Sequence, residues 1–499
     1  MSNAADPTVE TSSGRVQGRR QGGVAAFHAL PYAAPSVGEL RFAAPRPHPG
    51  WTGVRDATQP GPALTQPASR LEAVMGKVSW PQSEAALTLT VWTPEVEGRL
   101  PVLVWIHGGG YSSGSASWPW YEGRRLAATG PLVVVGINYR LGALGFLYVA
   151  ELDGVDTGAA NRGLLDQVAA LEWVRENIAR FGGDPEQVTL AGQSGGGGSI
   201  AAMMAMPPAK RLFRRAILQS PALLPPFPKE EAIEISRRYR TVLGTEGADL
   251  RGLRSATVDR LLAAQLEVAA SERRLADLRP PFQFVTDGTV MKRDFNDELR
   301  TGAGAGVDVV IGSNRGELRL PVPEDTTYEQ VIGRIRPAAG AAGEALIAEY
   351  AAALGDGSPA HLLGPLLTDE YIFRSLRLAG DQVRSGDRAY VYTFDWAPAG
   401  SRFGCCHTLE LPFVFDNFAA WAASPMLEGA EPAEMAAVGR PLHTAWASFA
   451  ARGEPQPAGG PRWEPYDPFT RKAMHFGGSQ PAMEDAPGGP TLSLWERLY

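Results

Sequence analysis

The segment that most constrains this chain is Gly192-Gln193-Ser194-Gly195-Gly196, which directly follows the apolar run 188–191. A serine flanked by glycines at the end of a strand suits a strand-to-helix turn that is too tight for larger neighbours. Gly192 and Gly196 leave room for a crossing backbone, and the Ser194 hydroxyl is held above the sheet. We therefore expect a nucleophile at Ser194 and acyl transfer as its chemistry. An ordinary turn between strand and helix is the alternative.

A second glycine-rich motif lies upstream. Residues 101–106 are expected to form a buried strand, and His107-Gly108-Gly109-Gly110-Tyr111 follows it. Consecutive glycines let backbone N–H groups converge on one point, as in the loop that supplies oxyanion donors in lipases and esterases. We assign these donors to the N–H groups of Gly109, Gly110 and Gly195. The order of the two motifs favours ester hydrolysis over a merely flexible turn.

The general base is predicted by elimination among the seven histidines. In this architecture the acid and then the histidine follow the serine along the chain, so the three histidines before Ser194 are excluded. Three others are expected elsewhere: His361 in a helical insert, His443 packed within a helix, and His475 in irregular structure near the C-terminus. His407 follows the strand-like run 389–394 after a loop, which suits a loop-borne base.

The acid that orients the base is predicted from a strand end. Residues 307–312 are expected to form a strand, and Glu317 lies just beyond its C-terminal end. Asp308 begins the same strand and therefore lies at the opposite edge of the sheet. Solvation at the surface is the alternative for a glutamate in a loop.

Several longer segments resemble a type B carboxylesterase of the carboxylesterase/cholinesterase family, close to its bacterial para-nitrobenzyl-esterase-like members. The resemblance covers nearly the whole chain and is carried by residues 30–33, 38–42, 89–94, 138–142, 163–167, 181–185, 312–317 and 407–410. It implies an α/β-hydrolase fold and a triad of Ser194, Glu317 and His407. It agrees with the three oxyanion donors and implies that no metal or organic cofactor is needed. Arg41 with Glu84, and Arg140 with Asp166, match the family's structural ion pairs.

The expected architecture is α/β, with a large, mostly parallel central sheet flanked by helices. Residues 1–100 are predicted to form an antiparallel edge, and strands alternate with helices from 101 to 220, which indicates βαβ units. Helix-rich segments at about 229–283 and 323–387 are expected as insertions over the active site. We expect one α/β-hydrolase domain over residues 1–499. If the family fold holds, four aromatic residues line a substrate gorge, although core packing is their alternative role: Tyr111, Trp118, Trp120 and Phe227.

The chain also departs from the family pattern. Gln193 stands where the family usually has Glu, which removes a carboxylate near the catalytic imidazole and argues against cationic substrates. Gly195 replaces the usual Ala and opens a glycine run that suggests close packing of helix and sheet. The positions matching a family disulfide are Leu64 and Ala86. The two cysteines, Cys405 and Cys406, are adjacent and are expected to behave as small buried hydrophobes.

Composition narrows the functional classes. The formal net charge of −7 argues against a nucleic-acid partner, and no apolar run is long enough to span a membrane. Residues 1–14 hold no apolar signal segment, so a cytoplasmic protein is expected, with removal of a native leader as the alternative. We expect a monomer or weak homodimer that hydrolyses small uncharged carboxylic esters. The alternatives are a non-catalytic binding module, or the same chemistry on a lactone, amide or thioester.

Overall fold

The computed structural model describes residues 5–152, 160–245, 250–271, 279–318, 325–478, 480–487 and 490–497. Among them, a sheet of 11 strands has the order β16-β15-β14-β13-β10-β9-β7-β8-β6-β4-β3. Seven neighbouring strands of this sheet are parallel: β8 (Val133–Ile137), β7 (Leu100–Ile106), β9 (Gly183–Gln193), β10 (Arg215–Gln219), β13 (Asp308–Asn314), β14 (Ala389–Phe394) and β15 (Lys472–Phe476). The parallel strands point the same way, so their C-terminal ends meet along one edge.

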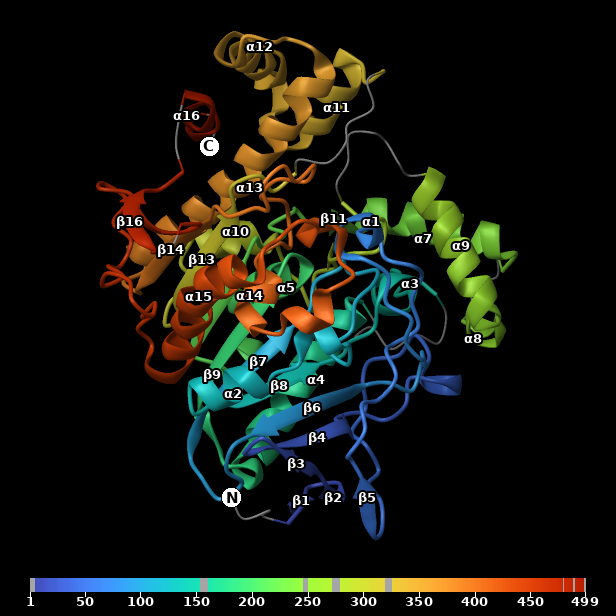
Figure 1. The fold of residues 1–499 in the computed structure, drawn as a ribbon. Helices are drawn as coiled ribbons and strands as arrows, with labels where there is room; N and C mark the ends of the chain where they lie inside the picture. Colours follow the sequence, from blue (N-terminus) through green and yellow to red (C-terminus); the bar gives the residue numbers. More distant parts are fainter. Residues whose placement is uncertain are drawn as a thin grey trace.

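Antiparallel strands close both sides of the sheet (Figure 1). One side carries β6 (Thr88–Thr93), β4 (Val24–Pro31) and β3 (Arg19–Gln21), and the other carries β16 (Ala482–Asp485). A separate sheet of β1 (Thr8–Thr11), β2 (Gly14–Gln17) and β5 (Val54–Asp56) lies near the N-terminus, and β11 (Phe227–Pro228) pairs with β12 (Val285–Thr286). The predicted antiparallel N-terminal edge and the mostly parallel centre are both confirmed.

The sheet separates two apolar cores. Along β7, Val102, Val104 and Ile106 belong to one core, whereas Leu103 and Trp105 belong to the other. This alternation follows from the two-residue period of a strand, because both faces of a parallel sheet are covered by helices. The helices on the first face include α3 (Gly142–Phe146), α4 (Arg162–Asn177) and α5 (Gly195–Met204). Those on the second include α2 (Arg124–Thr129), α14 (Leu411–Phe415) and α15 (Pro432–Arg452).

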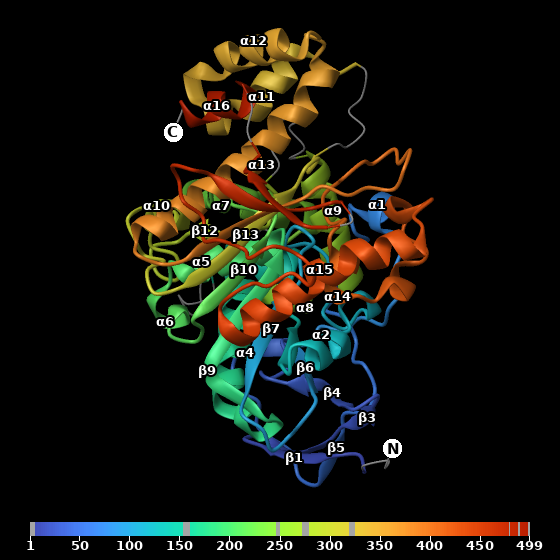
Figure 2. The same cartoon turned by 60° about the vertical axis from the view of Figure 1, so that its left-hand side comes forward.

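The two segments expected to be helix-rich do contain most of the remaining helices. The first holds α7 (Lys229–Leu243), α8 (Arg251–Ser255) and α9 (Val258–Ser271), and the second holds α11 (Tyr328–Ala339), α12 (Gly343–Leu354) and α13 (Pro359–Arg384). Parts of these predictions, at 246–249, 272–278 and 323–324, lie outside the described residues. In both ribbon views α11 and α12 lie with α16 (Pro490–Glu496) at the end of the molecule opposite the N-terminus (Figures 1 and 2).

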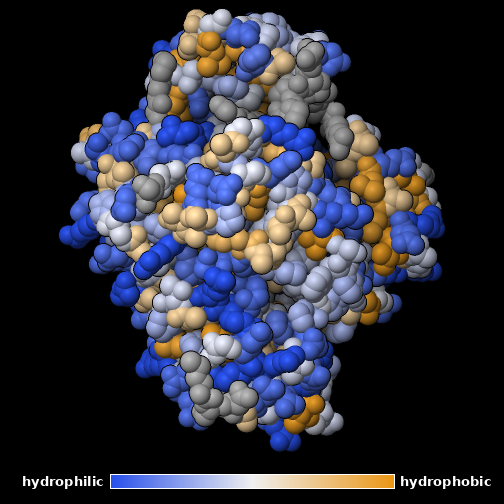
Figure 3. Space-filling model, in the orientation of Figure 1, coloured by the Kyte–Doolittle hydropathy of each residue, from blue (hydrophilic) through white to orange (hydrophobic). Residues whose placement is uncertain are grey.

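Shorter helices complete the described chain: α1 (Glu72–Met75), α6 (Pro207–Lys210) and α10 (Phe295–Arg300). One face of the molecule is largely hydrophilic, and apolar residues gather over α7 and α9 at its right-hand side (Figure 3). Within the described ranges, no helix has both the length and the apolar character that a membrane crossing requires.

Two of the three histidines placed elsewhere lie as expected. His361 is on α13, and the buried His443 on α15 bonds the Val414 carbonyl oxygen at 2.8 Å. The prediction for His475 was wrong, because this residue lies in strand β15 and its Nδ1 donates to Asp395 at 2.6 Å. The parallel pairing of β15 with β14 decided this, and such long-range pairing was not visible in the local sequence.

Both predicted structural ion pairs form. Arg41 Nη2 lies 2.6 Å from Glu84, and Arg140 Nη2 lies 2.7 Å from Asp166. The Arg140–Asp166 pair is the more enclosed, with side chains 3% and 0% exposed, and Arg140 Nε adds a second bond of 2.8 Å. A buried pair with this bidentate geometry ties the loop after β8 to helix α4.

We expect Asp166→Asn to destabilise the folded chain by about 3–5 kcal/mol, because it leaves the Arg140 guanidinium buried without its counter-charge. Equilibrium unfolding in urea measures this change. The matched control is Glu10→Gln, which removes the exposed pair with Arg15 (3.7 Å) and should cost less than about 1 kcal/mol. Equal losses in the two variants would contradict a special role for the buried pair.

Candidate active site

Ser194 occupies a strained turn between β9 and α5. Its backbone angles are φ +55° and ψ −120°, a conformation that non-glycine residues rarely adopt. Three backbone hydrogen bonds hold it: its N–H donates to the Gln219 carbonyl at 2.9 Å, and its carbonyl accepts from Gly198 at 2.9 Å and Ala222 at 3.0 Å. Hydrogen bonds to strand β10 and to the loop that follows it therefore hold the turn in its strained conformation.

The glycines of this turn are required by close approaches of backbone. A Cβ atom on Gly196 would lie 2.0 Å from the carbonyl oxygen of Ile106 in β7, and one on Gly198 would lie 2.6 Å from that of Ala222. Both distances are shorter than real Cβ contacts and both neighbours are backbone atoms, so larger residues are excluded. Close packing thus explains these two positions of the glycine run, as the sequence suggested. A Cβ on Gly195 would lie 3.3 Å from Tyr111 Cε1, a tight contact that the flexible ring could relieve.

The glycine-rich loop after β7 lies against the serine turn. A Cβ on Gly195 would stand only 3.5 Å from the amide nitrogen of Gly110. Gly109 and Gly110 have φ values of +110° and +59°, which turn their N–H groups in a way that other residues rarely allow. Across the chain as described, the N–H groups of Gly109, Gly110 and Gly195 donate to no protein acceptor. Such N–H groups are suited to bind an oxyanion.

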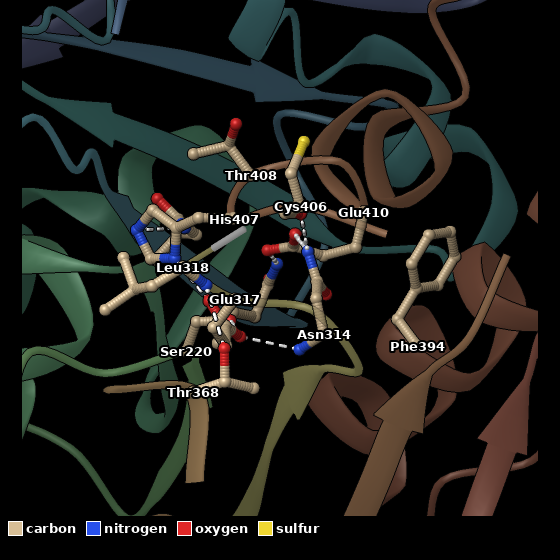
Figure 4. Close-up of polar contacts among 12 residues, drawn as sticks. Ser220, Asn314, Glu317, Leu318, Thr368, Phe394, Cys406, His407, Thr408 and Glu410 are labelled. Carbon is tan, nitrogen blue, oxygen red and sulfur yellow. Dashed lines mark hydrogen bonds and ion pairs between the residues drawn. The ribbon is translucent and has the colours of Figure 1, made fainter. Parts of the chain in front are cut away.

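His407 and Glu317 form a buried hydrogen-bonded pair (Figure 4). His407 Nδ1 donates to Glu317 Oε2 at 2.5 Å, and the His407 peptide N–H donates to the Glu317 carbonyl at 3.1 Å. Glu317 is 0% exposed. Its other oxygen accepts from the Ser220 hydroxyl at 2.5 Å and from the Asn314 N–H at 2.6 Å. This arrangement leaves His407 Nε2 as the acceptor nitrogen.

Nearby carboxylates determine the electrostatics of this pair. Burial alone lowers the pKa of His407, but the charge of Glu317 and its hydrogen bond, with Glu410 beyond, outweigh burial and raise that pKa above its usual value. Burial and the charge of Glu317 also raise the pKa of Glu410. Glu410 accepts hydrogen bonds from Gln219 Nε2 at 3.0 Å and Asn314 Nδ2 at 2.8 Å, so it links β10, β13 and the histidine loop.

Gln193, the residue before the serine, contacts the imidazole directly. Its Nε2 lies 3.2 Å from His407 Nε2, and both side chains are buried. Because His407 Nδ1 carries the proton shared with Glu317, the amide of Gln193 is the donor and favours the neutral ring. Among the described residues, the Ser194 hydroxyl has no hydrogen-bond partner. Catalytic bonds of this kind are often long without substrate.

The four aromatic residues predicted for a gorge do not gather at one place. Tyr111 is buried at the end of the glycine-rich loop, with its ring 4.7 Å from that of Phe284. Trp118 and Trp120 line a hollow of about 260 Å³ with the segment 66–82, and Trp120 stacks on Trp421 at 4.4 Å. Phe227 is buried in β11 under the guanidinium of Arg279. Of the four, Tyr111 is the one whose contacts reach the serine turn.

The sequence analysis missed three residues at this site: Ser220, Asn314 and Tyr371. Ser220 and Asn314 lie at the ends of β10 and β13 and bond Glu317, so the rule that polar residues gather at the C-terminal ends of parallel strands could have indicated them. Tyr371 is on α13, and its ring lies 5.8 Å from the His407 ring. No local motif marks it.

The remaining predicted features have structural roles. His107 stacks on Tyr139 at 4.5 Å, and burial lowers its pKa to about 4, so it stays neutral. Cys405 and Cys406 are free and buried, and burial raises the pKa of the Cys406 thiol to about 12. A thiol held protonated in this way is a poor nucleophile and metal ligand.

Comparison with known proteins gives consistent matches along the whole chain. The family model described as "Carboxylesterase family" matches residues 5–495. A phenmedipham hydrolase of Pseudarthrobacter oxydans is 36% identical over 462 residues, covering 90% of each chain. A para-nitrobenzyl esterase of Bacillus subtilis (strain 168) is 35% identical over 473 residues, covering 93% of this chain and 94% of the relative. A solved thermophilic PNB esterase structure matches with a TM-score of 0.89 at 34% identity, covering 99% of this chain and 100% of that chain.

We expect Gln193→Glu to raise the pKa of His407 by about one unit or more, because a carboxylate beside Nε2 favours the imidazolium. Titration of the imidazole signals by NMR measures this change without any substrate. His107, whose pKa of about 4 depends on burial, serves as the internal control and should not move. An unchanged His407 titration would contradict the direct contact between Gln193 and the ring.

Proposed function

This chain belongs to the carboxylesterase family, and on that premise we propose that Ser194, His407 and Glu317 are its catalytic triad. The chain has the α/β-hydrolase fold and is a serine carboxylesterase, as its homologues are. The observation that carries the assignment of the triad is the buried bond of 2.5 Å between His407 and Glu317, next to the residue that precedes Ser194.

In the proposed reaction, Ser194 Oγ attacks the carbonyl carbon of the ester while His407 Nε2 takes its proton. Glu317 holds the ring in the tautomer that can accept this proton and stabilises the imidazolium that forms. The N–H groups of Gly109, Gly110 and Gly195 bind the oxygen that becomes negative. The imidazolium then protonates the leaving alcohol, and water hydrolyses the acyl-enzyme by the same steps.

We propose uncharged esters as the substrates. Gln193 places a neutral amide, not a carboxylate, beside the catalytic ring, so the site lacks one source of attraction for a cation. Tyr111 adds an aromatic ring next to the proposed oxyanion donors, which suits an apolar or aromatic substrate. One relative is named para-nitrobenzyl esterase, and para-nitrobenzyl esters are uncharged and aromatic.

Hydrolysis of p-nitrophenyl acetate, butyrate and octanoate tests the proposed nucleophile. We expect Ser194→Ala to lower kcat by about 10⁴-fold or more, because the attacking hydroxyl is lost. Ser255→Ala, at an exposed helix end, should change nothing, and circular dichroism checks that both variants fold. A wild type as inert as Ser194→Ala would favour a non-catalytic binding module. Activity retained in Ser194→Ala would mean another nucleophile.

The pH dependence of kcat/KM tests the proposed base. His407 must be neutral to accept the proton, so activity is lost as the pH falls through its pKa. Because that pKa is raised, we expect the midpoint of the acid limb above about pH 6.5. Glu317→Gln removes the charge that raises it, so the midpoint should move to lower pH while the maximal rate falls. An acid limb that does not move would exclude His407 as the titrating group.

A further inference from the structure

Tyr371 is the one residue of helix α13 whose ring contacts the catalytic imidazole. The centroids of the two rings are 5.8 Å apart and their planes meet at 72°, an edge-to-face arrangement. Tyr371 is half-buried, so part of the residue is accessible to solvent. A substrate bound at Ser194 and at the acceptor nitrogen of His407 would therefore lie close to this ring.

Hydrogen bonds from α13 to two loops, one turn before Tyr371 and one turn after it, fix the position of this residue. One turn before it, the Thr368 hydroxyl accepts a hydrogen bond from the Leu318 N–H at 3.2 Å, next to Glu317 (Figure 4). One turn after it, Arg374 Nη1 donates to the Leu223 carbonyl at 2.9 Å, in the loop that follows β10. Arg374 is also paired with Glu370 at 2.8 Å. The helix is thus fastened to the acid loop and to the loop beside the serine turn.

The hydroxyl group of Tyr371 has no hydrogen-bond partner in the described part of the chain. The enclosed hydroxyl of Tyr392 lacks a partner there too, whereas Tyr139 donates to the His107 carbonyl at 2.8 Å and Tyr32 donates to the Asn138 carbonyl at 2.7 Å. Unlike the hydroxyl of Tyr392, that of Tyr371 is not enclosed by protein atoms, so it is open to solvent. A group of a bound molecule can therefore take the place of water at the Tyr371 hydroxyl.

This group has to be a hydrogen-bond acceptor. Burial, reinforced by the charges of Glu317 and Glu370, raises the pKa of the Tyr371 phenol above its usual range. The hydroxyl therefore keeps its proton wherever the enzyme works and acts as a donor. Because the substrates proposed above are uncharged esters, the acceptors that they can offer are neutral oxygens such as those of ethers and carbonyl groups.

We propose that Tyr371 determines specificity: its hydroxyl donates a hydrogen bond to a neutral oxygen of the substrate close to the ester, so that esters carrying such an oxygen are preferred over alkyl esters of equal size. This inference rests on the proposed function and adds a substrate class to it. The oxygen can belong to the acyl part or to the alcohol part, because His407 serves both in the reaction.

Two matched pairs of esters test the proposal with purified wild type and Tyr371→Phe. The acyl pair is p-nitrophenyl pentanoate and p-nitrophenyl 3-methoxypropanoate, and the alcohol pair is butyl butyrate and 2-methoxyethyl butyrate. In at least one pair, Tyr371→Phe should lower kcat/KM about 10-fold for the ester with the extra oxygen and less than about twofold for the alkyl ester. Differences in intrinsic reactivity cancel, because each ester is compared between the two enzymes.

Two controls separate specificity from structure. Tyr371→Phe keeps the ring against His407, so the acid limb of the pH profile should not move. Tyr328→Phe, at an exposed tyrosine whose hydroxyl donates to Gly357, should leave all four rates unchanged. If Tyr371→Phe changed kcat/KM equally for both members of both pairs, the proposal would be overturned. The Tyr371 ring would then only pack against His407. Inactivity of the wild type toward all four esters would instead overturn the proposed function and, with it, this inference.

Discussion

The buried carboxylate of Glu317 is the charge on which the rest of the site depends. An ionised carboxylate enclosed by protein is stable only if donors surround it. Here the donors come from separate parts of the chain: Asn314 at the end of β13, Ser220 at the end of β10, and His407 in the loop after β14. The parallel register of these strands brings their C-terminal ends together. The sheet therefore places the hydrogen-bond donors around the Glu317 carboxylate.

A second constraint is steric. The serine turn passes so close to β7 that a Cβ atom on Gly196 would lie 2.0 Å from the Ile106 carbonyl. The same closeness sets the start of α5 beside the glycine-rich loop, because β7 ends where that loop begins. The strained conformation of Ser194 is maintained by hydrogen bonds to β10 and to the loop after it.

Much of the fold was predictable because its signals are local. The strand at 389–394 and the helix near 432–452 follow from apolar periodicity, and both lie where it placed them. The positive φ of Gly110 follows from the conformational freedom of glycine, which is a property of a single residue. His475 was misplaced because pairing with β14 makes that segment a strand. The sequence could not decide whether Trp118, Trp120 and Phe227 pack in the core or line a cavity, because aromatic residues in both places have the same local sequence pattern.

The sequence alone indicated the residue types of the candidate site and their order along the chain, since the proposed nucleophile and the glycine loop belong to short motifs and the proposed acid and base follow predicted strands. Only the tertiary structure decided which groups surround them. Ser220 meets Glu317 from 97 positions away, and the Tyr371 ring meets His407 from a different helix. Such contacts depend on the register of the sheet and the path of α13. Both result from packing across the whole chain, which no local pattern records.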